Sequence, residues 1–137
     1  VSQIVWSPIA QGVLTGKYQP GQKPPEGSRA ADEKGGADMI KRFMNDDELT
    51  RVQGLAPIAD EVGLSMAQLA VAWVLQNPNV AAALVGASRP EQVHENVKAA
   101  GVKLEPELMA KIDDVLGDIV ERDAAKTKET APQSRVA

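Results

Sequence analysis

The stretch that decides the fold is Val80 to Glu91, with the sequence VAAALVGASRPE. The apolar residues from Val80 to Val85 predict a β-strand of the kind that a parallel sheet covers on both faces. A turn of small residues then leads into a helix, for which Ser88 and Glu91 have the spacing of a capping box. A buried strand that runs through a short turn into a helix is typical of α/β folds with parallel strands.

A second strand and an intervening helix extend this pattern toward the start of the chain. Val1 to Trp6 is a β-rich stretch that ends at a proline, and it predicts a strand. Ser65 and Gln68 form a capping box before an apolar helix over 67–75, which we expect to be buried. Two strands alone do not make a stable sheet. We therefore expect the chain to be part of a larger closed architecture, for which a β/α barrel is the first candidate. The sequence reads as a piece that begins within such a fold.

Three further helices are predicted by apolar periodicity. One covers about 46–62 and is expected to have a kink or a break near Gly54, because Pro57 removes a backbone hydrogen bond. Another begins at about Pro106. The helix after the turn has the expected inner stripe Val93, Val97 and Ala100.

Two segments lack a sustained apolar period. The segment from Ala10 to Asn45 is punctuated by glycine and proline, which indicates a functional lid or a disordered loop. The residues 121–137 have almost no apolar content, and we expect a disordered tail there.

Composition excludes several classes of protein. The chain has 137 residues, 43% of them apolar, and a net charge of −4, which disfavours a nucleic-acid or anionic-membrane binder. It has no cysteine and one histidine, so disulfides, a thiol nucleophile, cysteine zinc sites and most histidine-rich metal sites are excluded. No apolar run is long enough for a membrane-spanning helix and no secretory leader is recognisable, so we expect a cytoplasmic protein.

The turn after the second strand is a candidate anion site. Unpaired amides at a helix N-terminus attract anions, and the guanidinium of Arg89 suits a phosphate. In β/α barrels the loops after the last strands are the usual place for phosphate. The same pattern also fits a plain capped helix, and the residues alone leave both interpretations open.

Three motifs resemble those of one known family. They are WSPIAQGVLTGKY over 6–18, SRA over 28–30 and GASRPEQVHEN over 86–96. In this order and spacing they resemble the C-terminal part of the aldo-keto reductases, in the branch that includes bacterial reductases and potassium-channel β-subunits. The resemblance covers about Val1 to Gly117. It implies that residues 1–120 are a truncated part of a (β/α)8 TIM barrel, with strands seven and eight and a cofactor lid at 10–45.

The resemblance also implies a binding site for NADPH. Trp6 matches the aromatic residue that stacks on the nicotinamide, and Lys17 and Arg29 match lid positions near the phosphates. Without the resemblance, Trp6 could equally be a core residue, and Lys17 and Arg29 would be solvated loop charges. The segment beside the pyrophosphate contributes Ser7, Pro8, Ile9 and Gln11. The positions for the 2′-phosphate, the adenosine and the adenine are Gly86, Ser88, Arg89, Gln92, Glu95 and Asn96.

The expected function follows from what matches and what does not. The family reduces aldehydes or ketones by hydride transfer, but its catalytic Tyr, Lys, Asp and His match no residue here. Tyr18 is expected to be a packing residue and His94 a solvated one. We therefore expect the NADP(H)-binding C-terminal portion of an aldo-keto reductase, with no catalytic residue and no metal site. The alternatives are a non-catalytic cofactor-binding or regulatory module, and an oligomer with a borrowed proton donor. Unpaired strand edges predict a homo-dimer or tetramer.

Overall fold

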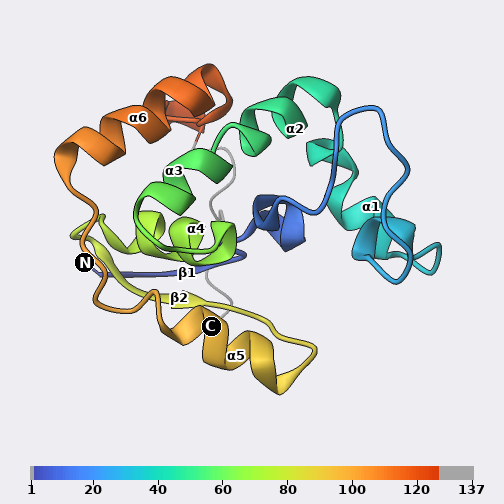
Figure 1. Cartoon of the computed structure of the whole chain (residues 1–137), viewed down its shortest axis with the longest axis horizontal. Coiled ribbons are helices and arrows are strands. Elements are labelled where there is room, and N and C mark those ends of the chain that lie inside the picture. Colours follow the sequence, from blue (N-terminus) through green and yellow to red (C-terminus); the bar gives the residue numbers. More distant parts are fainter. Residues whose placement is uncertain (1, 127–137) are drawn as a thin grey trace.

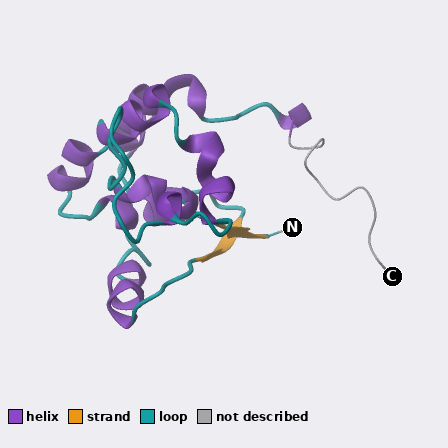
Figure 2. Ribbon diagram, turned by 90° about the vertical axis from the view of Figure 1, so that its right-hand side faces the viewer, coloured by secondary structure: helices purple, strands orange, loops and turns teal. Residues whose placement is uncertain are grey.

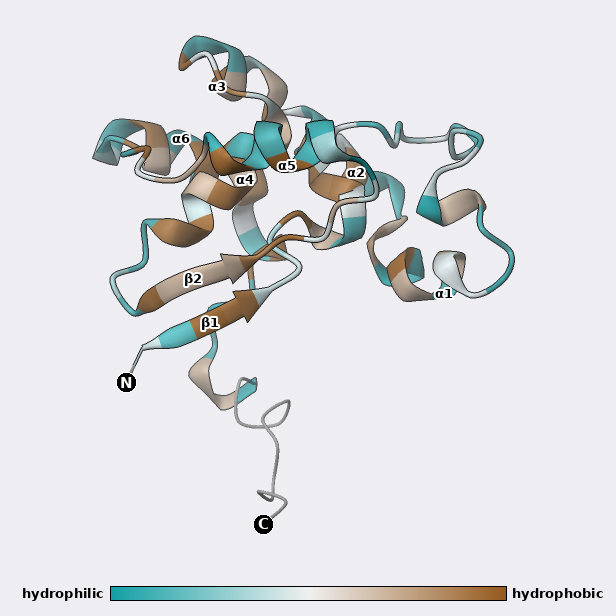
Figure 3. Ribbon diagram, turned by 90° about the horizontal axis from the view of Figure 1, so that it is seen from below, coloured by the Kyte–Doolittle hydropathy of each residue, from teal (hydrophilic) through white to brown (hydrophobic). Residues whose placement is uncertain are grey.

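The computed structural model describes residues 2–126, in which two parallel strands are combined with helices. The strands β1 (Gln3–Trp6) and β2 (Val80–Leu84) lie side by side, with Trp6 opposite Leu84 in the register (Figure 1). In Figure 3 both arrowheads point the same way. The predicted α/β class and the pairing of these two strands are therefore confirmed.

The helices predicted from apolar periodicity all form. The segment from Ala10 to Asn45, for which no helix was predicted, holds several short helices and is therefore not a disordered loop. They are the 3-10 helices Ala10–Thr15, Arg29–Ala31 and Lys41–Phe43 and the helix α1 (Gly36–Ile40). The remaining elements are α2 (Asp46–Gln53), α3 (Ala56–Glu61), α4 (Met66–Leu75), α5 (Pro90–Val97), α6 (Pro106–Leu116) and the 3-10 helix Gly117–Ile119.

The buried helix α4 begins with the predicted capping box. The Ser65 hydroxyl accepts from the Gln68 amide at 3.2 Å, and the Gln68 side-chain oxygen accepts from the Ser65 amide at 2.9 Å. The Gln68 side chain is itself buried, and its Nε2 donates to the carbonyl of Glu95 in α5 at 2.9 Å. One glutamine therefore starts α4 and also fixes the position of α5.

The predicted break near Gly54 is confirmed, and the structure adds a packing reason for it. Between α2 and α3, a Cβ on Gly54 would lie 2.9 Å from Cγ1 of Val115 in α6. The glycine therefore permits α6 to pack closely, while Pro57 lies in the first turn of α3, where its missing amide costs no hydrogen bond.

Two apolar clusters form the core of the described part of the chain. The larger lies between α3, α4 and α6 and includes Ile58, Leu69 and Ile112. The smaller joins the 10–45 segment to α2 through Val13, Tyr18, Ile40, Leu49 and Val52. Gln53 of α2 reinforces this connection, because its Nε2 donates to the carbonyls of Gly16 and Tyr18.

One face of the strand pair is not covered by the described residues. Figure 2 shows the strands at the edge of the molecule with the helices to one side, and α4 is the helix with most contacts to β2. Ile4 and Leu84 are 66% and 60% exposed. The prediction of a strand covered on both faces is therefore wrong for β2 within this chain, because no described element packs on its second face.

The predicted inner stripe of α5 is also wrong. Val93 and Val97 are 55% and 61% exposed, whereas Gln92, Glu95 and Asn96 lie on a half-buried face. The hydrogen bond from Gln68 to Glu95 turns this polar face toward α4. A groove lined by Val93, Val97 and small residues of β2 remains open beside it.

The last predicted helix, from Pro106, is confirmed as α6. The predicted disordered tail over 121–137 is described only to position 126, and there Arg122 pairs with Asp113 of α6 at 2.6 Å; positions 127–137 lie outside the described residues. Within the described part of the chain, no single helix is long and apolar enough to cross a membrane. The pair Asp46–Glu61 and Met66–Leu75 reaches such a length only jointly and across an 87° bend.

Candidate functional site

A cleft of about 920 Å³ lies where the carboxyl ends of both strands meet α5 and the 10–45 segment. Parallel strands present their carboxyl ends at one edge, which is where ligands bind in α/β folds. This volume is near the upper end of the roughly 300 to 1,000 Å³ typical of ligand pockets. The cleft is therefore large enough for an extended ligand with several chemical groups.

The cleft gathers the residues that the sequence motifs singled out. All predicted site residues except Arg89 line it, from Trp6, Ser7, Pro8, Ile9, Gln11, Lys17 and Arg29 to Gly86, Ser88, Gln92, Glu95 and Asn96. Arg89 instead lines a smaller groove, together with His94, and this groove shares Ala87 and Ser88 with the cleft. Three segments that are distant in the sequence thus line one continuous cleft, and Arg89 lies next to it in the chain.

Trp6 stands at the end of β1 with its side chain largely exposed. It is 71% accessible, and its register partner Leu84 also lines the cleft. Trp6 is therefore not buried among the described residues, but Ile4 and Leu84 on the same strand pair are exposed as well, so both interpretations that the sequence left open remain. An exposed indole at a strand end offers a flat apolar surface for a ring system.

The backbone directly after β1 is strained. Ser7, Ala10 and Gln11 have positive φ angles of 53°, 47° and 60°. Residues other than glycine rarely adopt this region, and each such residue costs of order 1 to 3 kcal/mol. Strain of this kind concentrates at binding sites, and here all three positions adjoin or line the cleft.

The strained turn continues into Gly12, which permits Lys17 to fold back over it. A Cβ on Gly12 would lie 3.1 Å from Nζ of Lys17, and the φ of Gly12 is +98°. Lys17 also lies over the ring of Tyr18, 5.3 Å from its centroid. The chain geometry therefore fixes the ammonium group at the wall of the cleft.

A chain of side-chain hydrogen bonds links the strained turn to Arg29. Gln11 donates from Nε2 to the hydroxyl of Ser7 at 2.8 Å and accepts from Arg29 at 2.5 Å. Arg29 also donates to the sulfur of Met39 at 3.6 Å. The guanidinium is thus held against the strand-end turn although it comes from a segment 18 residues further along the chain.

The N-terminus of α5 is capped by a residue that the spacing did not indicate. The side-chain oxygen of Gln92 accepts from the Ser88 amide at 2.8 Å, from the Ser88 hydroxyl at 3.2 Å and from the Arg89 amide at 3.3 Å. The helix begins at Pro90, one residue later than a cap at Ser88 requires. The predicted capping box of Ser88 and Glu91 is therefore wrong, and Gln92 takes its role.

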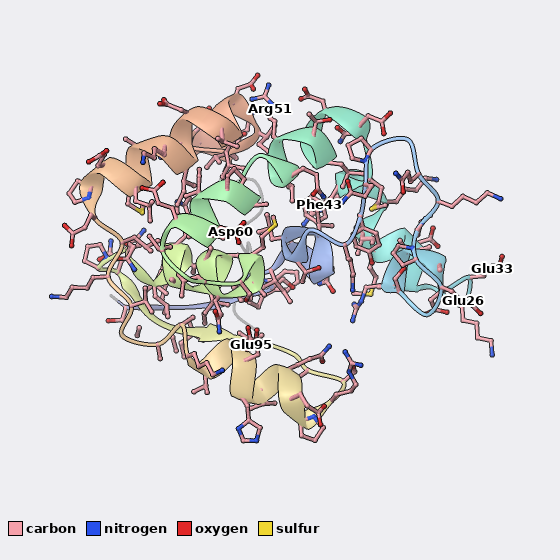
Figure 4. All side chains as sticks on the ribbon, viewed as in Figure 1. Glu26, Glu33, Phe43, Arg51, Asp60 and Glu95 are labelled. Carbon is pink, nitrogen blue, oxygen red and sulfur yellow. The ribbon has the colours of Figure 1, made fainter. Side chains whose placement is uncertain are left out.

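Glu95 lies on the side of α5 that faces the rest of the chain, as Figure 4 shows. Its carbonyl accepts from Gln68, and its carboxylate lies 3.6 Å from the ammonium of Lys98. The backbone of Glu95 is therefore held against α4, while its side chain lines the cleft.

Ser28 is a cleft residue that sequence reasoning missed. It is only 9% exposed, and its hydroxyl has no hydrogen-bond partner among the described residues. Its place next to Arg29 in a matched motif was the available signal. The other missed lining residues are Gly12, Thr15, Gly27, Ala67, Leu84, Ala87 and Glu91.

Tyr18 and His94 behave as the sequence predicted. Tyr18 is 1% exposed, and its hydroxyl accepts from the amide of Ala30 at 3.3 Å, so it is a packing residue. His94 is exposed on α5 outside the cleft. Neither side chain offers a proton to the interior of the cleft.

The fold and the cleft define an α/β protein with a cavity at the carboxyl ends of its two parallel strands. The Aldo/keto reductase family model matches residues 1–116. The chain belongs to this family, as its motifs predicted.

Named relatives place the chain more closely within the family. A probable voltage-gated potassium channel subunit beta of Arabidopsis thaliana is 45% identical over 113 residues, which cover 81% of this chain and 34% of the relative. A putative subunit of the same kind from Schizosaccharomyces pombe is 44% identical over 82% of this chain and 33% of the relative. The chain thus spans about a third of the length of these relatives.

A solved structure is also similar. A thermostable aldo-keto reductase, Tm1743, crystallised with the inhibitor epalrestat, superposes with a TM-score of 0.52 at 26% identity. The match covers 84% of this chain and 30% of that one. The α/β fold of the described residues is therefore that of an aldo-keto reductase over most of the chain.

Proposed function

We propose that this chain is the NADP(H)-binding C-terminal portion of an aldo-keto reductase, corresponding to strands seven and eight of a (β/α)8 barrel. The observation that carries the proposal is the convergence of three family motifs on one cleft. Packing alone does not explain why an exposed tryptophan, two cations and a polar helix face meet in this cleft. A cofactor with a flat ring, phosphates and an adenine would account for this combination.

The residues fit the successive parts of NADPH. Trp6 offers its exposed ring to the nicotinamide, and Lys17 and Arg29 offer positive charge to the pyrophosphate. Ser88 and Gln92 at the start of α5 suit the adenosine phosphate, with Arg89 at the margin for the 2′-phosphate. When bound, NADPH supplies a hydride to an aldehyde or ketone.

The proton that such a reduction also requires has no evident donor in the described part of this chain. The hydroxyl of Tyr18 accepts from the Ala30 amide, and Tyr18 is buried and does not line the cleft. We therefore propose that this chain binds and orients the cofactor, and that carbonyl reduction needs a donor from elsewhere. A cytoplasmic setting and a homo-oligomeric state belong to the same proposal.

A second candidate function is a non-catalytic cofactor-binding or regulatory module. The observation that favours it is the 45% identity with a probable potassium channel subunit beta. This candidate shares the cleft and its ligand and differs only in what the bound cofactor is used for. Turnover of a reactive aldehyde with NADPH by this chain alone is expected for neither candidate, and it would instead support the third alternative, an oligomer with a borrowed proton donor.

Cofactor binding can be tested through the two tryptophans. In a Trp73→Phe variant, Trp6 is the sole remaining tryptophan, and titration with NADPH is expected to quench its emission. In a Trp6→Phe variant the emission of Trp73, on α4, is expected to respond much less. The absence of any response in the first variant, together with no heat in calorimetric titration, would contradict the proposal.

A further inference from the structure

We propose that Gln11 is a positioning residue: its side-chain amide fixes the guanidinium of Arg29 over the anion-binding part of the cleft without neutralising it. This inference rests on the proposed binding of NADPH and assigns a role to one side chain within that site. The ligand class it concerns is a group with several negative oxygens, such as a pyrophosphate.

The first step is that Arg29 needs a partner to be held in place. Arg29 is the first residue of a three-residue 3-10 helix, and its side chain is exposed, so local packing does not fix the position of the guanidinium. An arginine side chain has many rotamers, and the entropy lost on fixing it is a cost that a ligand would otherwise have to offset on binding. The bond from Arg29 to Gln11 at 2.5 Å restrains this freedom before a ligand arrives.

The second step is that the partner is neutral. Among the described residues no carboxylate lies within ion-pair distance of Arg29; its side-chain partners are the oxygen of Gln11 and the sulfur of Met39. An amide oxygen orients a guanidinium, whereas a carboxylate would also cancel its charge. The positive charge therefore remains available to an anion, and the other nitrogens of the fork remain available as donors.

The third step is that Gln11 is itself held rigidly. Its amide nitrogen donates to Ser7 at 2.8 Å, and its backbone stands at φ 60° within the strained turn. Glycine would adopt this backbone at lower cost, but it would remove the bridge. The strain is accounted for if the side chain at this position has a task, and the bridge from Ser7 to Arg29 is that task.

The test is a double-mutant cycle on NADPH affinity, with Gln11→Ala, Arg29→Ala and the double variant. We expect Gln11→Ala to weaken binding about fivefold to tenfold and Arg29→Ala to weaken it more. In the Arg29→Ala background, Gln11→Ala is expected to have almost no further effect. Gln22→Ala, an exposed glutamine in the same segment, is the matched control and should leave affinity unchanged.

A Gln11→Glu variant tests the importance of a neutral partner. It keeps the bridge but pairs Arg29 with a carboxylate, so we expect weaker binding than in Gln11→Ala and a shallower dependence on salt concentration. Thermal melting of each variant verifies that the fold is retained, and Gln11→Met, of similar length without an acceptor, replaces Gln11→Ala if the latter unfolds.

The outcomes separate this inference from the proposed function. Equal losses from Gln11→Ala with and without Arg29 would overturn the positioning role, since they would show that Gln11 contacts the ligand directly. If the unmodified chain does not bind NADPH, the proposed function fails. The same cycle is then measured with inorganic pyrophosphate, where coupling between the two residues supports the inference and its absence overturns it.

Discussion

The side-chain oxygen of Gln92 accepts a hydrogen bond from the backbone amide of Ser88 at 2.8 Å, and so occupies a donor that a phosphate could use. The same oxygen also accepts from the Ser88 hydroxyl and the Arg89 amide. The start of α5 thus carries its own acceptor. A bound phosphate either replaces this oxygen, releasing three donors at once, or binds beside it. A negative charge on residue 92 would favour the capping role and oppose the binding of a phosphate, so a charge change at this residue separates the two roles.

A Gln92→Glu substitution should separate these two roles. The carboxylate keeps the acceptor position and gains from the helix dipole, so we expect the free energy of unfolding to rise by about 0.3 to 1 kcal/mol. The same negative charge should lower NADPH affinity at least tenfold. Urea unfolding and calorimetric titration measure the two effects. Unchanged affinity would place the phosphate away from the start of α5.

Replacing Arg89 with Ala should weaken NADPH much more than NADH. A charge-assisted hydrogen bond to the 2′-phosphate contributes about 1.5 to 3 kcal/mol, and NADH lacks that phosphate. Arg89 does not line the cleft itself but follows Ser88, which does, so the prediction also tests whether the cofactor extends past Ser88. Lys103→Ala, an exposed cation beyond α5, is the control. Equal losses for both cofactors would remove Arg89 from the 2′-phosphate site.

The two predicted capping boxes show what sequence spacing could and could not settle. Ser65 and Gln68 were predicted correctly, because hydroxyl and amide reach each other across a first turn that starts where the pattern indicates. Ser88 and Glu91 have the same spacing, but the helix starts one residue later and the Gln92 side chain is within reach instead. Local pattern does not fix a helix boundary to one residue.

Which side chains of α5 and of the cleft are buried depends on tertiary contacts, and a local sequence pattern does not specify these contacts. The stripe with Val93 and Val97 has the spacing of a core face, yet Gln68 turns the opposite face inward. The matched motifs, by contrast, contain most residues of the cleft lining, although eight of the lining residues were not predicted as site residues. Ser28 was missed because an unpartnered buried hydroxyl can be recognised only once its surroundings are known.

A Ser28→Ala substitution should leave the ligand-free chain as stable or make it more stable. A buried hydroxyl without a partner costs about 1 to 3 kcal/mol, so its removal is expected to raise the free energy of unfolding by up to about 1 kcal/mol after the lost packing of the oxygen. Denaturant unfolding measures this change. A clear loss of stability would show that the hydroxyl has a hydrogen-bond partner in solution.

Hydrogen exchange should divide the 10–45 segment into two parts. Amides near Val13, Tyr18 and Ile40 are expected to be protected with or without cofactor, because these side chains belong to the core cluster with α2. The exposed stretch around Arg29 is expected to gain protection only when NADPH is added. No change there on saturation with NADPH would contradict a lid function for this stretch.

The exposed face of the strand pair should cause copies of this chain to associate. Ile4 and Leu84 are 66% and 60% exposed on adjacent strands, and the outer edges of β1 and β2 have no strand partner among the described residues. Apolar surface and unpaired strand edges both favour contact between copies, and closed symmetry ends such growth. We expect a dimer or tetramer in sedimentation at micromolar concentration.

The face and the edges can be distinguished by one substitution and its control. Ile4→Lys places a charge on the apolar face without removing a backbone hydrogen-bonding group, and it should shift the assembly toward monomer if the face drives association. Val62→Lys, at an exposed apolar position after α3, should leave the assembly unchanged. If neither variant alters a stable oligomer, pairing of strand edges is the dominant contact. A monomer that unfolds cooperatively at micromolar concentration would show that α4 alone stabilises the strand pair, and the expected association would be wrong.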